Sequence, residues 1–136
     1  MSKATIRLFP LALLAAACAR GDGTATAEEA ATRQAKACYE ALYLKGEPET
    51  FLNGHANAPA MPTEYREQLT EALRHHLRSL GADRQGVTAV KAVRAEMDST
   101  LHVMQVFLAL TYGDDRQEEI VVPMVQTAPD GKWKMK

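Results

Sequence analysis

The spacing of apolar residues changes near residue 86. In two stretches before it, apolar residues recur every three or four positions, which is typical of amphipathic helices. After it, apolar residues alternate with polar ones or form short runs rich in valine, which is typical of strands. The pattern therefore predicts a domain in which helices come first and strands follow.

Two long helices with a short helical turn between them are expected in the first part. Residues 27–44 form the first helix, and residues 47–54 form the short turn. The second long helix covers residues 63–80. Thr63 is placed to cap its start, and Gly81 is expected to end it, because glycine is common just past the last turn of a helix.

Four strands are expected in the second part, over residues 87–97, 101–112 and 118–127 and in the terminal segment KWKMK. The turn segments MDST, YGDDR and APDG separate them, and strands joined by such short turns run antiparallel. The expected fold class is α+β: helices first, then a curved four-stranded antiparallel meander packed on them. Pro123 lies inside the third strand and cannot donate a ladder hydrogen bond, so a β-bulge is expected there.

The second strand is apolar on both faces. One face is expected to form the core, and the other would be wet unless something covered it. We therefore expect a homodimer that forms through the outer face of the sheet. The expected core face consists of His102, Met104, Val106, Leu108, Leu110 and Tyr112, and the outer face of Leu101, Val103, Gln105, Phe107, Ala109 and Thr111.

The first residues are typical of an export signal. Lys3 and Arg7 precede an apolar stretch, residues 8–17, and Cys18 follows it. A positive segment, an apolar segment of about ten residues and small residues at its end are the parts of a secretory signal peptide. The stretch is too short to cross a bilayer, which needs about 20 apolar residues. We expect residues 1–17 to be a signal peptide that is removed.

The segment LAAAC, residues 14–18, resembles the lipobox of bacterial lipoproteins, although Ala15 stands where leucine is usual. The resemblance implies cleavage before Cys18 and acylation of that residue. Because Ala19 carries no inner-membrane retention signal, it also implies a lipid-anchored protein of the outer membrane. Residues 18–26 would then be a tether. The alternative is cleavage after ACA by the ordinary signal peptidase, which gives a freely secreted or periplasmic protein.

Composition and charge narrow the range of partners. The chain of 136 residues is 46% hydrophobic and 24% charged, and residues 27–136 are enough for one globular domain. The net charge is −1 without a basic stripe, which excludes nucleic acid as a partner. Acylation of Cys18 would leave Cys38 as a small buried hydrophobe with no disulfide partner, whereas an unmodified Cys18 would allow a bridge between the two.

Three segments carry a resemblance to a known fold: ACYEALYLKGEPETFL (residues 37–52), LALTYGDDRQEEIVVPMV (108–125) and DGKWKMK (130–136). Together with the order of elements, they resemble the nuclear transport factor two-like, or cystatin-like, cone fold. In particular, the chain resembles small bacterial lipoproteins of that superfamily that have no assigned function. The superfamily includes isomerases, dehydratases, transport adaptors and binding modules, so the resemblance implies a fold rather than one function.

The resemblance also indicates which residues could carry chemistry. Enzymes of the superfamily use a buried Asp or His with a Tyr, which implies His102 with Tyr39 as the candidate pair here. Tyr43 and Trp133 are expected to line the same pocket. No aspartate falls on an inward position of a strand, and this argues against an isomerase-like enzyme.

The sequence predicts neither a metal nor a cofactor, because it has no HxxxH or CxxC pair and no glycine-rich phosphate loop. We therefore expect a lipid-anchored binding module of the cell envelope that catalyses no reaction. It would hold a small apolar ligand, or bind a protein partner, between the helices and the bent sheet. The alternatives are a small pocket enzyme that uses His102 and Tyr39, and a structural subunit that docks by its sheet.

Overall fold

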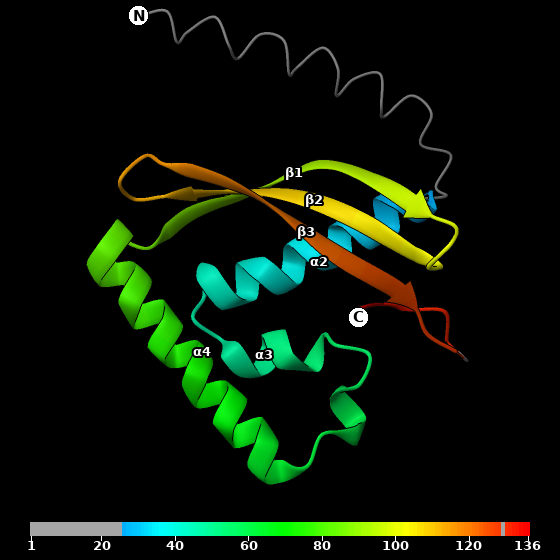
Figure 1. Ribbon diagram of the computed structural model, residues 1–136, viewed down its shortest axis with the longest axis horizontal. Coiled ribbons are helices and arrows are strands. Elements are labelled where there is room, and N and C mark those ends of the chain that lie inside the picture. The colour runs from blue at the N-terminus through cyan, green and yellow to red at the C-terminus, as the bar shows by residue number, and fades with distance from the viewer. Residues whose placement is uncertain (1–25, 129) are drawn as a thin grey trace, which may run out of the picture.

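The computed structural model describes residues 26–128 and 130–136, and the expected signal peptide and Cys18 lie outside this range. The helices come first and a four-stranded antiparallel sheet of order β1-β2-β3-β4 follows, which confirms the predicted fold class. Figure 1 shows α2 lying across one face of the sheet, α3 beyond it, and α4 running along the side. The elements are α2 (Ala27–Tyr43), α3 (Pro48–Asn53), the 3-10 turn η1 (Ala58–Ala60), α4 (Thr63–Arg84), β1 (Val87–Asp98), β2 (Val103–Tyr112), β3 (Gln117–Gln126) and β4 (Trp133–Met135).

Helix α2 begins with a reciprocal cap. The Glu29 backbone N–H donates to the Thr26 hydroxyl oxygen at 3.0 Å, and the Thr26 N–H donates to the Glu29 carboxylate at 3.1 Å. These two bonds satisfy donors that the first turn of a helix otherwise leaves unpaired. The cap therefore sets where the folded domain starts, next to the expected tether.

The core lies between α2 and the sheet. One face of α2 is buried against alternate residues of β2, as the two periodicities predict. Cys38 is buried in this layer, and burial raises the pKa of its thiol, as expected for a small core residue. The buried residues of the layer are Ala31, Ala35, Cys38 and Leu42 from α2 and Met104, Val106, Leu108, Leu110 and Tyr112 from β2.

The prediction that His102 belongs to this core face is wrong. His102 is exposed, lies in the turn between β1 and β2, and has a left-handed backbone with φ of 57°. The Asp98 carboxylate accepts the N–H groups of Thr100 and Leu101, at 3.0 and 3.1 Å, and these bonds hold the chain in the turn up to His102. The alternation of burial in β2 therefore begins at Met104, and Val103, which was expected on the outer face, is also buried.

Both predicted ends of the second long helix also need correction. Pro62, rather than Thr63, occupies the N-cap position, and α4 continues through Gly81 to Arg84. Gln85 then adopts a left-handed conformation with φ of 63°, and the Leu80 carbonyl accepts the N–H that closes the helix. Gly81 does not end the helix because the bonds that close it lie one turn later.

The bulge predicted at Pro123 is absent from β3. The pairing of β2 with β3 is continuous, and Pro123 stands opposite Gln105. The Pro123 carbonyl accepts from the Lys136 N–H at 2.9 Å, so its ring nitrogen, on the same side of the strand, also faces away from β2. The missing donor costs no bond between β2 and β3. The sheet is irregular in the pairing of β1 with β2 instead, where the register shifts at Thr88 and again at Val93.

The outer face of the sheet has an apolar centre that one arginine covers. The Arg94 guanidinium lies 3.8 Å from the centre of the Phe107 ring and pairs with Glu96 at 2.9 Å and Glu119 at 3.4 Å. Val121, opposite Phe107 in the register, remains 48% exposed. This face is therefore partly shielded by its own charges, and self-association through it stays a prediction.

Candidate functional site

The structure separates the four residues that were predicted to share a pocket. Tyr39 and Tyr43 come together, with ring centres 6.1 Å apart. Trp133 instead lines a hollow beside the first half of α2, with Ala30. His102 lies in the exposed turn between β1 and β2, so the structure gives no support to a catalytic pair of His102 with Tyr39.

A cavity of about 360 Å³ lies where the end of α2, the last turns of α4 and the start of β1 meet. We call it the tyrosine cavity. Its walls combine aliphatic side chains with one phenol, one ammonium group and glycine backbone, so a ligand would meet apolar and polar surface there in similar measure. The lining residues are Leu42, Tyr43, Leu44, Lys45, Gly46, Leu77, Leu80, Gly86 and Val87.

The phenol of the cavity is held by a histidine on α4. The Tyr43 hydroxyl lies 2.9 Å from His76 Nε2, and the two rings meet edge to face. His76 is exposed, so water reaches it from outside the cavity. This hydrogen bond ties α4 to α2. This hydrogen bond matters because α4 contributes only one buried residue, Thr70, to the interior.

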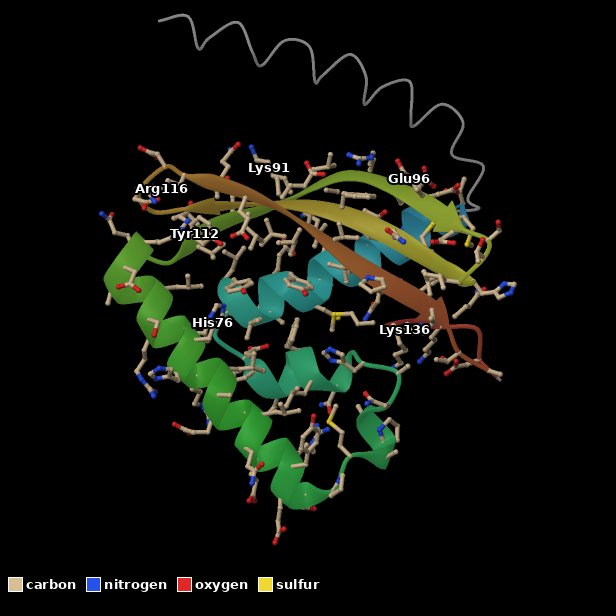
Figure 2. All side chains as sticks on the ribbon, viewed as in Figure 1. His76, Lys91, Glu96, Tyr112, Arg116 and Lys136 are labelled. Carbon is tan, nitrogen blue, oxygen red and sulfur yellow. The ribbon has the colours of Figure 1, made fainter. Side chains whose placement is uncertain are left out.

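A second polar group lies at the same end of the domain, where Figure 2 labels Tyr112 and His76. The Tyr112 hydroxyl donates to the Glu118 carboxylate at 2.5 Å, across the turn between β2 and β3. The Arg84 guanidinium, at the end of α4, lies 4.9 Å from the centre of the Tyr112 ring. Aromatic and charged side chains from α4, β2 and β3 thus meet here.

Both phenols hold their protons tightly. Burial, together with the neighbouring Tyr39, Tyr112 and Glu118, raises the pKa of Tyr43 to about 12. Burial, with the bond to Glu118, raises the pKa of Tyr112 to about 12, against the opposing charge of Arg84. At neutral pH the two groups are hydrogen-bond donors, and they are unsuited to act as bases or nucleophiles.

Sequence reasoning missed the pairing of Tyr43 with His76. Periodicity places His76 at the edge of the apolar stripe of α4, but nothing in the sequence shows which residue of α2 faces it. Among residues 26–128 and 130–136, no group of three or more His, Cys, Asp and Glu side chains could hold a metal ion. In the same part of the chain, no helix has the length and apolar character needed to cross a membrane.

No protein-family model matches this sequence, and no curated protein matches it either. A solved structure from Campylobacter jejuni, described as an NTF2-like transpeptidase, is similar in fold, with a TM-score of 0.58. The similarity covers 76% of this chain and 94% of that one, at 14% sequence identity. The chain therefore has an NTF2-like fold, as the resemblance implied. At this identity the comparison supports the fold alone.

Proposed function

We propose that this protein is a non-catalytic binding module, anchored to the bacterial cell envelope by a lipid on Cys18, that holds a small apolar ligand in the tyrosine cavity. The observation that carries the proposal is the composition of the cavity. Leu42, Leu77, Leu80 and Val87 supply apolar walls, and Tyr43 supplies one hydroxyl group that its hydrogen bond with His76 orients. An apolar ligand with a single polar atom able to hydrogen-bond with that hydroxyl would match both.

Binding without catalysis is favoured by the protonation state of the site. A general base must lie within reach of a bound ligand and be able to take a proton near neutral pH. The pKa of the Tyr43 phenol is raised to about 12, so it keeps its proton at neutral pH, and its partner His76 does not line the cavity. The groups that line the cavity are thus suited to orient a ligand and not to transfer its protons.

A probe-binding experiment tests the ligand site. N-phenyl-1-naphthylamine, a neutral apolar fluorophore, is expected to bind the purified protein with an increase in fluorescence. Leu77→Glu places a charge in the cavity wall and should weaken binding by about tenfold or more. Ala72→Glu makes the same change at an exposed position of α4 and should leave binding unchanged. Equal affinity of the two variants would contradict the site.

A separate experiment tests the anchor. Cells grown with an alkyne-labelled fatty acid should yield a labelled protein, and Cys18→Ser should abolish the label. Mass spectrometry should show a chain that begins with acylated Cys18. A chain that begins at Arg20 without acyl groups would show cleavage by the ordinary signal peptidase and would refute the anchor, without bearing on the cavity.

A second proposal concerns the outer face of the sheet, which we propose to pair two copies of the chain. Val121, opposite Phe107 in the register, is 48% exposed, and Val93 at the register shift of β1 is 46% exposed. Arg94 covers the Phe107 ring and pairs with Glu119, so its side chain must move aside when two such faces meet. Native mass spectrometry and light scattering at tens of micromolar should detect a dimer, and a monomer alone would refute the pairing.

A further inference from the structure

A second and larger cavity, of about 600 Å³, lies between the segment after α3, the first turn of α4 and the end of the sheet at β4. We call it the His55 cavity; Asn53, His55, Arg66 and Lys134 line it, and it shares no lining residue with the tyrosine cavity. We propose that the His55 cavity binds a small hydroxylated carboxylate, in addition to the apolar ligand proposed above.

Two half-buried cations supply the site for the carboxylate. Arg66 lies in the first turn of α4, and its Nη2 donates to the Asn53 side-chain oxygen, which leaves its other N–H groups for a ligand. Lys134 lies in β4. No ion pair within the described part of the chain includes either of them. Two half-buried cations without a protein counter-ion are a strong site for an anion, because an ionised acceptor strengthens the hydrogen bonds they donate.

An acidic residue at the rim does not cancel this charge. Asp130 also lines the cavity, but it is exposed, and one of its oxygens accepts from the Lys132 N–H at 3.1 Å. One exposed carboxylate therefore stands against two half-buried cations. The cavity keeps a net positive charge from Arg66 and Lys134 whatever His55 contributes, which favours an anionic ligand.

His55 adds a requirement for a hydroxyl group on the ligand. Its Nδ1 lies 3.2 Å from both the Phe51 and the Leu52 carbonyl oxygens. Carbonyl oxygens only accept hydrogen bonds, so Nδ1 carries the proton, and in the neutral ring Nε2 is the acceptor. A ligand that meets Nε2 must therefore donate. A carboxylate cannot donate, whereas a hydroxyl on the same molecule can.

The backbone holds His55 firmly in place. The chain at His55 pairs with Met135 as an isolated β-bridge: the Ala56 N–H donates to the Met135 carbonyl, and the Met135 N–H donates to the Gly54 carbonyl, both at 2.8 Å. The His55 ring also packs edge to face on Phe51, with centres 5.2 Å apart. An acceptor fixed in this way costs little further ordering when a ligand binds.

Titrations of the purified protein, followed by NMR, test the assignment with four probes. Gluconate carries a carboxylate and hydroxyls, hexanoate a carboxylate alone, glucose hydroxyls alone, and inorganic phosphate an anion of different geometry. We expect gluconate to shift the amide signals of residues around the cavity and the His55 ring signals at concentrations on the order of 1–10 mM. The other three should bind at least about fivefold more weakly. Binding of hexanoate or phosphate as tight as that of gluconate, or no shift with gluconate, would overturn the proposal.

Matched variants separate the site from the general charge of the protein. Arg66→Gln and Lys134→Gln should each weaken gluconate binding by about tenfold. Arg78→Gln removes an exposed cation from the same helix as Arg66 and should change binding by less than about twofold. If one of the two site variants does not fold, as judged by circular dichroism, the other still decides the question. An equal loss in Arg78→Gln would show non-specific attraction and refute the site.

Discussion

Gly54 stands where the chain leaves no room for a side chain. Its φ of −79° is ordinary for any residue, so its backbone conformation does not require glycine. A Cβ atom at this position would lie 2.5 Å from Cys38 Sγ and 3.2 Å from Met135 Cε. The reason for glycine here is therefore the buried thiol of α2, and Gly54→Ala tests the packing of α2 against the end of the sheet.

The size of the effect follows from these distances. Carbon makes favourable contacts with heavy atoms at about 3.5–4.0 Å, so the new methyl group would overlap the sulfur by about 1 Å. Overpacking of a dense core costs about 1–3 kcal/mol, and the lower entropy of alanine in the unfolded chain returns about 0.4–1 kcal/mol. We expect Gly54→Ala to lower the free energy of unfolding by about 1–2 kcal/mol, and Tm by about 5–10 °C.

Urea denaturation followed by far-UV circular dichroism measures the loss, and two further variants check its cause. Gly81→Ala adds a methyl group inside α4, where the Cβ meets no atom within 4 Å, and should stabilise the protein by about 0.5–1 kcal/mol. Cys38→Ala removes the sulfur, so Gly54→Ala should cost at least about 1 kcal/mol less in that background. Additive effects of the two changes would refute the reasoning, because they would show that the sulfur and the methyl group do not meet.

Three further variants address the helix cap, the phenol and the outer face. Thr26→Ala should lower the free energy of unfolding by about 1 kcal/mol in urea denaturation, because it removes the side-chain cap of α2. Stability should fall between pH 10 and 12, since the unfolded chain releases tyrosine protons near pH 10 while burial raises the pKa of Tyr43 to about 12 in the folded state. Tyr43→Phe should reduce the slope of stability against pH in this range. An unchanged slope would contradict the assignment to Tyr43. Arg94→Ser uncovers Phe107 and should raise the dimer fraction in light scattering, whereas Lys91→Ser, with the same loss of charge, should not.

The fold could be predicted from the sequence because its signals are local. The alternation in β2 identified the buried face from Met104 to Tyr112, since a strand needs only a period of two to select a side. The same rule failed at His102, where the bonds to Asp98 accompany a turn that is two residues longer than the alternation shows, through Leu101 and His102. The low helix propensity of glycine led to a second wrong prediction, that the helix ends at Gly81. The residues on both sides of Gly81 are helical, and α4 continues through it.

The two cavities could not be predicted, because contacts between distant residues build them. Tyr43 and His76 are 33 positions apart, and neither periodicity nor composition indicates that their side chains meet. Arg66 and Lys134 line one cavity from helix and sheet, and each alone resembles an ordinary surface cation. The sequence gives the faces that pack, whereas the end of each helix and the twist of the sheet decide which residues converge at the rim.

One edge of the sheet is only partly paired, because β4 is shorter than β3. Within the described part of the chain, β4 pairs with Met124, Val125 and Gln126, and the Lys136 N–H donates to the Pro123 carbonyl, so residues 117–122 of β3 offer their backbone on that side to any extended peptide that approaches. Pro123 stands at the start of this border, where its carbonyl is already paired and its ring nitrogen has no hydrogen to donate, and Glu118 and Glu119 place negative charge farther along it. A second copy of the chain that paired along this edge would find no hydrogen-bond donor at Pro123 and would then meet repulsion between like charges. Pro123, which costs no bond inside the domain, thus hinders the growth of fibres by edge pairing.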